Sequence, residues 1–313
     1  MEALRVFSGN SNMPLSREIC SHIGIELSPL EISRFSNDNY FVRVLTNVRE
    51  RDVFVIQSFT APVSNHIMEL FIIMDALRSA SARRITAVIP YFSYARSDKK
   101  DAPRISITGR LMADLIRAAG ADRVLTMDLH SDAVHGFFSM PVDHLTAAPL
   151  IAGHLKHTMD LSRAVAVATD AGGAKRVGKF AAQLGVPMAI IDKRRLGDDE
   201  VVQGLVVGDV KGKDAIIFDD EISTGGTLVA TARTLASAGV DSMVMGATHP
   251  VLCGNAPANL AASKVDRFVV SNTVQVDEAK QMENMDVISV APLMAEAIKR
   301  IHSGESVGAL FST

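Results

Sequence analysis

Apolar β-branched runs alternate along the whole chain with amphipathic stretches of helical length. The apolar runs have the length and composition of buried strands. They lie at residues 4–7, 53–57, 85–90, 124–128, 164–169, 188–192 and 215–219. The amphipathic stretches repeat their apolar residues with helical spacing. They lie at residues 65–79, 106–119, 173–184, 226–238 and 291–302. This alternation predicts an α/β fold with mainly parallel sheets flanked by helices.

Residues with turn and cap preferences mark the expected ends of these helices. Ser64 or Asn65 can cap the helix at residues 65–79 through a side-chain oxygen. Glycines stand where the left-handed conformation closes a helix. These glycines are Gly120, Gly185 and Gly239.

The strand and helix order starts again about half-way along the chain, which predicts two domains. A strand ends in an acidic residue and runs into a loop in each half, at Asp128 in the first and at Asp170 in the second. The length of the chain fits two domains of ordinary size, residues 1–146 and 147–313. Pattern alone leaves open whether the last helix, at residues 291–302, caps the second domain or packs on the first.

Composition and charge exclude several classes of protein. The net charge is -3, and the charged residues are 21% of the chain and of both signs, so nucleic acid and membrane surfaces are not expected as partners. The two cysteines, Cys20 and Cys253, have no metal-site spacing and predict neither a disulfide framework nor a zinc site. Since no signal sequence and no apolar run of about 18 residues is present, we expect a cytoplasmic protein.

The most specific motif joins the strand at residues 215–219 to the helix at residues 226–238. Glycines let the backbone approach a ligand, and the N–H groups at a helix N-terminus favour an anion, so the turn suits a phosphate. Paired carboxylates accept hydrogen bonds from a vicinal diol. Phosphate and diol together indicate a ribose phosphate, whereas the plain alternative is a capped helix start. The motif residues are Asp219, Asp220, Ser223, Thr224, Gly225, Gly226 and Thr227.

Three further segments carry candidate chemistry, and each also has a plain structural interpretation. Residues 90–100 combine aromatic and basic side chains, which suit a stacked base and a triphosphate but also a solvated face. Residues 193–195 are three consecutive cations that can neutralise a transferring phosphoryl group or simply face solvent. His130 and Asp170 can hold Mg²⁺, or can serve as a loop histidine and a helix cap.

Two motifs resemble a known family. Asp-Asp followed by Thr-Gly-Gly-Thr resembles the ribose-phosphate loop that ribose-phosphate pyrophosphokinases share with type I phosphoribosyltransferases. Residues 128–143 resemble the D-L-H, G-F-F and P-x-D signature of the pyrophosphokinases, which the transferases lack. The resemblance runs from residues 7–10 to residues 248–250 and implies two tandem phosphoribosyltransferase-like domains, the first on the nucleotide side and the second with the ribose 5-phosphate loop.

The resemblance implies an enzyme that transfers the β,γ-diphosphoryl group of Mg-ATP to the 1-hydroxyl of ribose 5-phosphate. The products are 5-phosphoribosyl 1-diphosphate, which feeds nucleotide biosynthesis, and AMP. Lys193 and Arg195 are the implied catalytic residues, the motif at 219–227 binds the sugar phosphate, and His130 and Asp170 bind Mg²⁺. The implied ATP-binding residues are Phe35, Asn37, Asn39, Arg96, Ser97 and Lys99.

Three positions depart from the family pattern. Asn39 replaces the usual Glu and Ser97 the usual Gln, which leaves nucleotide preference open, and Ser223 replaces a third Asp in the ribose-phosphate loop. The resemblance further implies a homo-oligomer built from dimers up to a hexamer, with inorganic phosphate as a candidate activator. Two alternatives stay open, a non-catalytic regulatory subunit of such a synthetase and a type I phosphoribosyltransferase.

Overall fold

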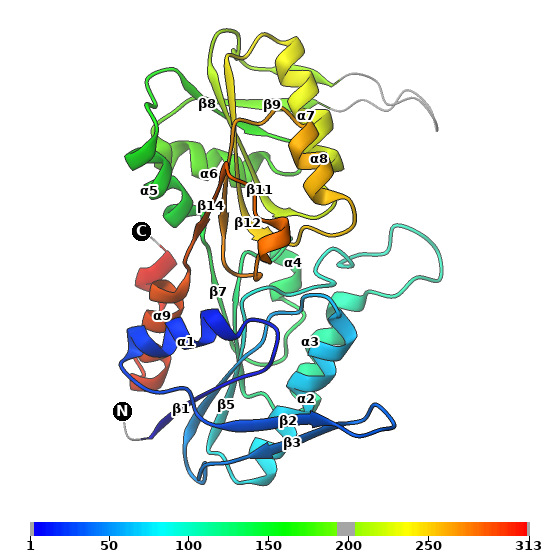
Figure 1. Cartoon of the computed structure of the whole chain (residues 1–313), viewed down its shortest axis with the longest axis vertical. Helices are drawn as coiled ribbons and strands as arrows, with labels where there is room; N and C mark the ends of the chain where they lie inside the picture. The colour runs from blue at the N-terminus through cyan, green and yellow to red at the C-terminus, as the bar shows by residue number, and fades with distance from the viewer. Residues whose placement is uncertain (1–2, 193–203, 312–313) are drawn as a thin grey trace. The chain divides into compact units, whose positions relative to one another are not determined.

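The computed structural model describes residues 3–192 and 204–311, and it divides into two compact units (Figure 1). The first unit comprises Met1–Thr146, Thr273–Gln275 and Ser289–Thr313. The second unit comprises Ala147–Asn272 and Val276–Ile288. The C-terminal segment of the chain therefore belongs to the first unit.

The described part of the first unit contains a five-stranded sheet of order β1-β4-β5-β6-β7, in which all neighbouring strands are parallel. Its strands are β1 (Leu4–Ser8), β4 (Asp52–Ile56), β5 (Arg84–Ile89), β6 (Arg123–Met127) and β7 (Val142–Leu145). A separate antiparallel hairpin consists of β2 (Leu30–Arg34) and β3 (Tyr40–Val44). The helices are α1 (Met13–Ile23), α2 (Val63–Ser79), α3 (Thr108–Ala118), α4 (Asp132–His135) and α9 (Ala291–Ser303).

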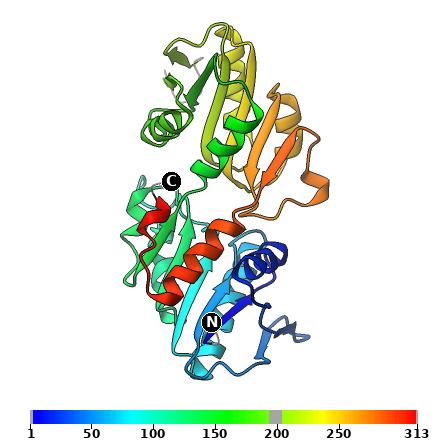
Figure 2. The same ribbon diagram turned by 90° about the vertical axis from the view of Figure 1, so that its left-hand side faces the viewer.

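Helices cover both faces of this sheet. Successive side chains of a strand point to opposite faces, and Val53 and Val55 of β4 pack in one cluster with apolar residues of α2 and α3. Phe54 and Ile56 alternate with them and are also buried. Figures 1 and 2 show α1 and α9 side by side against the opposite face from α2 and α3. Burial on both faces explains the nearly continuous apolar runs of these strands.

The second unit contains, among the residues described, a seven-stranded sheet of order β10-β9-β8-β11-β12-β13-β14. Every neighbouring pair is parallel except β10 and β9. Its strands are β8 (Ala164–Ala168), β9 (Met188–Asp192), β10 (Leu205–Val207), β11 (Asp214–Ile222), β12 (Ser242–Pro250), β13 (Arg267–Ser271) and β14 (Met285–Ile288). The helices α5 (Ala148–Thr158) and α6 (Ala174–Leu184) pack on one face. The helices α7 (Gly226–Ser237) and α8 (Ala256–Ala262) pack on the other.

The expected α/β fold with mainly parallel sheets and flanking helices is confirmed in both units. One strand differs in a way that matters for the site. β11 continues to Ile222, three residues beyond the predicted end at Asp219, because its pairing with β12 extends to Pro250. Its pairing with β8 ends earlier, at Ile217 and Val167. The acidic pair therefore lies within β11, on a stretch that has lost its β8 neighbour.

The C-terminal helix α9 is tied to the first unit by a buried carboxylate. Asp52 starts β4, and its side chain is only 10% exposed. Its Oδ1 accepts a hydrogen bond of 2.8 Å from Nε of Arg84, and its Oδ2 accepts one of 2.8 Å from Nδ1 of His302 at the end of α9. The guanidinium of Arg84 also donates to the carbonyl oxygen of Ile301 at 2.8 Å. Asp52 and Arg84 together fix the end of α9 to the sheet.

Loss of this carboxylate should destabilise the first unit strongly. We expect Asp52→Ala to lower the free energy of unfolding by about 3 kcal/mol, because it leaves a partly buried guanidinium without its ion pair. Urea denaturation followed by circular dichroism measures the change. The control is Asp75→Ala, which removes an exposed pair with Arg78 and should cost no more than about 1 kcal/mol. Equal losses in the two variants would contradict the role given to Asp52.

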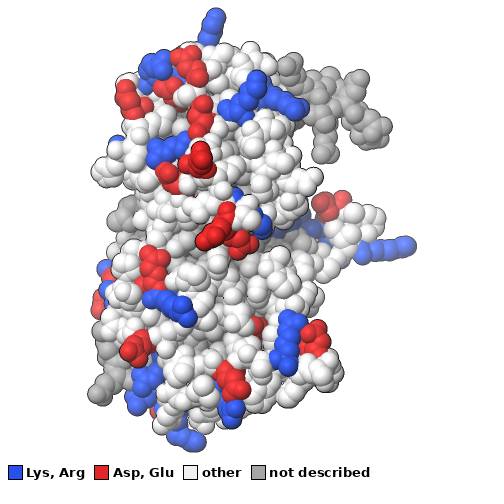
Figure 3. All heavy atoms as spheres, in the orientation of Figure 1, with Lys and Arg blue, Asp and Glu red and all other residues white. Residues whose placement is uncertain are grey.

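The surface carries charges of both signs without one dominant patch on the face drawn. Figure 3 shows Lys and Arg spheres interspersed with Asp and Glu spheres. Among the described helices, none combines the length and the apolar character that a bilayer span requires.

Candidate active site

The centre of the second unit's candidate site is the acidic pair on β11. The Asp219 side chain is 22% exposed and that of Asp220 only 3%. Arg176, in the first turn of α6, contacts both: its Nη2 lies 2.9 Å from Oδ1 of Asp219, and its Nη1 lies 3.2 Å from Oδ1 of Asp220. The hydroxyl of Thr169, at the end of β8, donates to Oδ2 of Asp219 at 3.3 Å. Two adjacent carboxylates thus share one guanidinium.

The environment of the pair disfavours two full negative charges. Burial, together with the hydrogen bond and the charge of Asp220, raises the pKa of Asp219 to about 7, although the charge of Arg176 acts in the opposite direction. A carboxylate at this site therefore titrates near neutral pH, which is unusual for Asp. A pKa shifted this strongly by burial and a charged neighbour is typical of functional sites.

The turn from β11 into α7 is fixed by a glycine and by hydrogen bonds from neighbouring segments. Gly225 has φ of 78°, in the left-handed region, and α7 begins at the next residue. The turn is held from the side of α8, where Asn259 donates to the carbonyl oxygen of Thr224 at 2.7 Å. The backbone N–H of Cys253 donates to the carbonyl oxygen of Ser223 at 3.1 Å. The first N–H groups of α7 have no partners within the helix, so this turn can receive an anion.

The predicted loop residues differ in exposure and in partners. Thr224, Gly226 and Thr227 are exposed, whereas Gly225 is buried. The hydroxyl of Ser223 lies 3.1 Å from the sulfur of Cys253. Thr224, Gly226 and Thr227 are therefore accessible to a ligand from solvent, whereas Gly225 forms the buried part of the turn.

Asp170 lies in the loop between β8 and α6. It directly follows Thr169, whose hydroxyl contacts Asp219. Its Oδ1 accepts a hydrogen bond of 2.9 Å from the N–H of Gly173, so the capping interpretation holds for one oxygen. The side chain is exposed. The described residues form no hydrogen bond to its other oxygen, which leaves a hard oxygen donor of the kind that Mg²⁺ prefers.

His130 belongs to the first unit, in the loop after β6. The residue is exposed. The loop is fixed on both sides: Leu129 N–H donates to Nε2 of His144 at 2.8 Å, and Ser131 Oγ donates to Oδ2 of Asp98 at 2.6 Å. Within the described ranges, no three His, Cys, Asp or Glu side chains gather as a ready-made metal cage.

The hairpin β2–β3 presents three of the predicted nucleotide residues at its tip. The ring of Phe35 is 57% exposed and makes an edge contact with Phe41 at 5.7 Å between centroids. The N–H of Phe35 donates to the carbonyl oxygen of Asn39 at 2.9 Å, and the side chain of Asn37 accepts from the N–H of Asn39 at 3.3 Å. Asn37 thus shapes the tip, and Phe35 offers an exposed aromatic surface.

The loop before α3 holds the other predicted nucleotide residues in different ways. Arg96 and Lys99 are exposed. The hydroxyl of Ser97 donates to the carbonyl oxygen of Ser106 and accepts from the N–H of Thr108, each at 3.1 Å. Ser97 therefore anchors the start of α3 with its side chain. Lys193 and Arg195 lie outside the described residues.

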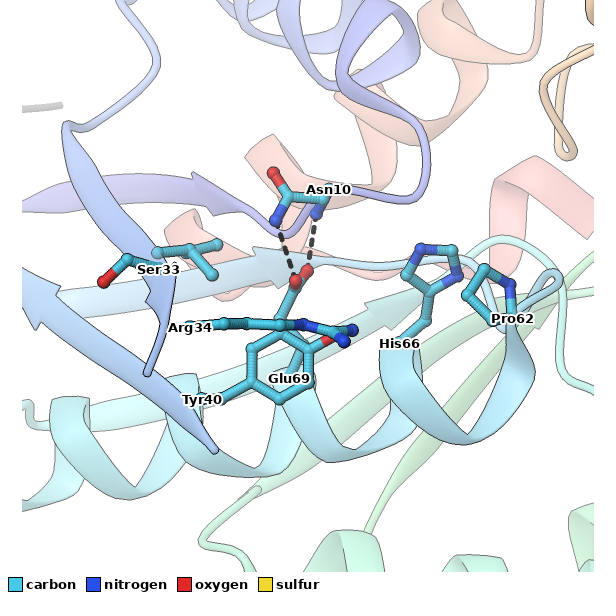
Figure 4. A pocket seen from close by; sticks show the side chains of 8 residues that line it. Asn10, Ser33, Arg34, Tyr40, Pro62, His66 and Glu69 are labelled. Atoms are coloured by element: carbon cyan, nitrogen blue, oxygen red, sulfur yellow. Dashed lines mark hydrogen bonds between the residues drawn. The ribbon is translucent and has the colours of Figure 1, made fainter. Parts of the chain in front are cut away.

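A cavity lies next to the hairpin in the first unit (Figure 4). It has a volume of about 370 Å³ and is lined partly by Arg34 and Tyr40 of the hairpin. Glu69 of α2 also lines it and is only 1% exposed. The backbone N–H and the side-chain amide of Asn10 donate to the two Glu69 oxygens at 2.6 and 2.8 Å. No signal in the sequence indicates this network, which joins the loop after β1 to α2.

Arg176 was also missed, although the sequence contains a signal for it. Lys175 and Arg176 occupy the first turn of α6, where the helix dipole disfavours cations by roughly 0.3–1 kcal/mol. A basic pair after a Gly-Gly turn therefore indicates a partner outside the helix. The Nε of Arg176 is buried without a hydrogen-bond partner among the described residues. The contacts of this side chain with the two carboxylates are therefore made by Nη1 and Nη2.

Comparisons with known proteins agree with this geometry. A family model described as the N-terminal domain of ribose phosphate pyrophosphokinase matches residues 4–120, and one described as the phosphoribosyl synthetase-associated domain matches residues 202–312. The ribose-phosphate pyrophosphokinase of Deinococcus radiodurans is 50% identical over 313 residues, which cover 99% of this chain and 98% of that protein. The chain belongs to the ribose-phosphate pyrophosphokinase family.

Further relatives of this family match over the full length. The ribose-phosphate pyrophosphokinase of Bacillus caldolyticus is 44% identical and is covered to 98%, as is this chain. The crystal structure of phosphoribosylpyrophosphate synthetase from Mycobacterium smegmatis superposes with a TM-score of 0.92 at 38% identity, covering 96% of this chain and 99% of that one. The family assignment confirms the resemblance and the two phosphoribosyltransferase-like units, and it sets aside the type I phosphoribosyltransferase alternative.

Proposed function

We propose that the protein is a catalytic ribose-phosphate pyrophosphokinase that makes 5-phosphoribosyl 1-diphosphate and AMP from ribose 5-phosphate and ATP. The observation that carries this proposal is the acidic pair on β11 directly before the Gly225 turn, in a chain of this family. Carboxylates serve a sugar diol, and the turn with the α7 N-terminus serves its phosphate. A regulatory subunit would have no need to keep both parts.

The sugar phosphate is expected to bind with its 5-phosphate at the turn and its hydroxyls toward the acids. The exposed Thr224 and Thr227 donate to phosphate oxygens, with the backbone of Gly225, Gly226 and Ser223 around them. Asp219 and Asp220 accept from the ribose hydroxyls. Holding the sugar at both ends fixes the 1-hydroxyl for attack, which is the main contribution that positioning makes.

The nucleotide is expected to use residues of the first unit. Phe35 offers an exposed ring for stacking against the base, and Asn37 and Asn39 offer amide groups at the same hairpin tip. Arg96 and Lys99 are exposed cations suited to a polyphosphate. Because the hydroxyl of Ser97 is engaged in the loop, we expect it to act by shaping this loop.

We propose His130 and Asp170 as the Mg²⁺ ligands. An exposed carboxylate and an imidazole fit the group, because Mg²⁺ keeps several waters and substrate phosphate oxygens and does not require a protein cage. When bound, Mg²⁺ neutralises the charge of the phosphates.

The reaction is a direct displacement. The 1-hydroxyl oxygen of ribose 5-phosphate bonds to the β-phosphorus of ATP, the bond from that phosphorus to the α,β-bridging oxygen breaks, and AMP leaves as the hydroxyl loses its proton. By family resemblance, Lys193 and Arg195 stabilise the charge on the transferring group. We also propose a cytoplasmic homo-oligomer built from dimers up to a hexamer, with inorganic phosphate as an activator.

Release of AMP from ATP tests the proposal. The purified protein, with Mg²⁺ and phosphate, is expected to release AMP only when ribose 5-phosphate is present. Repeating the assay with GTP and CTP measures what Asn39 and Ser97 have done to nucleotide preference. Absence of sugar-dependent monophosphate with every nucleotide would contradict a catalytic function and leave the regulatory subunit.

A further inference from the structure

Arg176 holds an unusual position between two neighbouring residues of one strand. Adjacent side chains of a strand point to opposite faces, yet the two ends of this guanidinium lie 2.9 Å from Asp219 and 3.2 Å from Asp220. The backbone N–H of Asp220 also donates to Oδ1 of Asp219 at 2.9 Å, which turns that carboxylate back along the strand. The two carboxylates therefore converge on the same cation.

The sheet leaves room for this contact. β8 pairs with β11 only as far as Val167 and Ile217. Beyond that point the β8 chain turns away through Asp170 to Gly173, and α6 starts directly after it. Arg176 thus reaches the acidic pair from the side on which β11 has lost its neighbour.

The charges around the pair come from several elements. Arg176 approaches from α6, the hydroxyl of Thr169 from the end of β8, and Asp220 from β11 itself. Glu221 follows on β11, opposite His249 of β12 in the strand register. Among these groups, Arg176 is the permanent cation that touches both carboxylates. It opposes the tendency of the buried pair to share a proton.

The protonation state decides what the pair can do with a diol. An ionised carboxylate only accepts hydrogen bonds, whereas a protonated carboxyl also donates one. We propose that Arg176 is a positioning residue that favours the ionised form of the Asp219 and Asp220 pair and keeps both side chains turned to accept hydrogen bonds from the ribose hydroxyls. This inference rests on the proposed function and assigns Arg176 no contact with substrate.

The pH dependence of the reaction tests this assignment. The variants are Arg176→Gln and Arg176→Lys, with kcat and both KM values measured from pH 6 to pH 9. An opposite charge at this distance lowers the pKa of a carboxyl by about 1–3 units. We therefore expect the acid-side midpoint of kcat/KM for ribose 5-phosphate to rise by about one unit or more in Arg176→Gln. At pH 7 its KM for ribose 5-phosphate should rise about tenfold, and its KM for ATP by less than about twofold.

Two comparisons separate charge from structure. Arg176→Lys keeps the cation and should restore most of the midpoint. Arg163→Gln is the matched control, because Arg163 also bridges two carboxylates, Asp241 at 2.7 Å and Asp214 at 3.3 Å, at the opposite ends of β8 and β11. We expect it to leave the midpoint and both KM values unchanged.

An unchanged midpoint in Arg176→Gln would overturn the inference, as would an increase in the KM for ATP equal to that for the sugar. Carboxyl ¹³C NMR of Asp-labelled protein gives the same answer without turnover: the titration of the Asp219 carboxyl should move to higher pH in Arg176→Gln. Absence of sugar-dependent AMP release in the wild-type protein would contradict the proposed function but not the inference. If the wild type is active and the Asp219 carboxyl titrates at the same pH in the wild type and in Arg176→Gln, the inference is wrong and the proposed function stands.

Discussion

We expect the Asp219→Asn variant to lose about a hundredfold in kcat/KM for ribose 5-phosphate while its fold becomes more stable at pH 8. The loss follows because an amide replaces a charged acceptor, and hydrogen bonds to charged groups contribute about 1.5–3 kcal/mol each. The gain follows because the folded protein holds an ionised Asp219 at a cost. Assays at pH 8 and urea denaturation at several pH values measure the two effects.

The sign of the stability effect comes from the raised pKa. The ordinary value for Asp is 3.8, and in the fold it rises to about 7. Between these values the folded state binds the proton more tightly than the unfolded chain, so stability falls as pH rises, and the full cost is present above about pH 7. Asn cannot ionise, so we expect the variant to gain about 1–3 kcal/mol at pH 8 and progressively less toward pH 4.

The matched control for this prediction is Asp209→Asn in the same unit. Asp209 is exposed and pairs with Lys213, an ion pair of the exposed type that contributes little to stability, so its removal should change neither activity nor the pH dependence of stability. A destabilisation of Asp219→Asn that is equal at pH 5 and pH 8 would contradict the charge argument. It would indicate instead that the carboxylate is needed for packing.

The predicted strands and most helix ends agree with the structure because local physics decides them. Apolar β-branched runs become buried parallel strands, and Gly120, Gly185 and Gly239 take positive φ after their helices. The predicted start of α2 was wrong. The helix begins at Val63, directly after Pro62, without a side-chain cap from Ser64 or Asn65. Proline fixes the backbone at the entry to this helix, which replaces the expected cap.

Elements without a strong local pattern were missed. β12 is a central strand, yet its sequence mixes Met, Gly, Ala and Thr with few β-branched residues. Neither strand of the β2–β3 hairpin contains a buried residue, and polar residues interrupt both, so neither has the apolar run of a buried strand. The packing of α9 with α1 joins the two ends of the chain, and the periodicity of α9 carries no information about its partner.

Some features of the candidate site could likewise be predicted from the sequence, whereas others depend on the fold. The turn at Gly225 could be predicted because glycine, hydroxyl and acidic residues are contiguous in the sequence. The pairing of Arg176 with Asp219 could not, because 43 residues separate them and only the fold brings them together. The anchoring role of Ser97 likewise depends on Ser106 and Thr108, which no motif links to it. The roles of His130 and Asp170 in metal binding stay predictions.

Gly225→Ala is expected to raise the KM for ribose 5-phosphate by about 10- to 100-fold with a smaller effect on the KM for ATP. Gly225 has φ of 78°, which costs an L-residue about 1–2 kcal/mol. A Cβ at this position would also lie 3.3 Å from Cβ of Asn259 and from Cδ2 of Leu260, both on α8. The turn must shift by some tenths of an ångström, and small displacements of a positioned group are costly in rate.

Gly185→Ala separates backbone strain from displacement of the turn. Gly185 ends α6 with nearly the same φ, 76°, but a Cβ there would meet nothing within 4 Å. Both variants should therefore lose a similar part of their stability in urea, whereas only Gly225→Ala should bind the sugar phosphate poorly. If both variants keep the wild-type KM, the backbone at Gly225 does not cradle the phosphate.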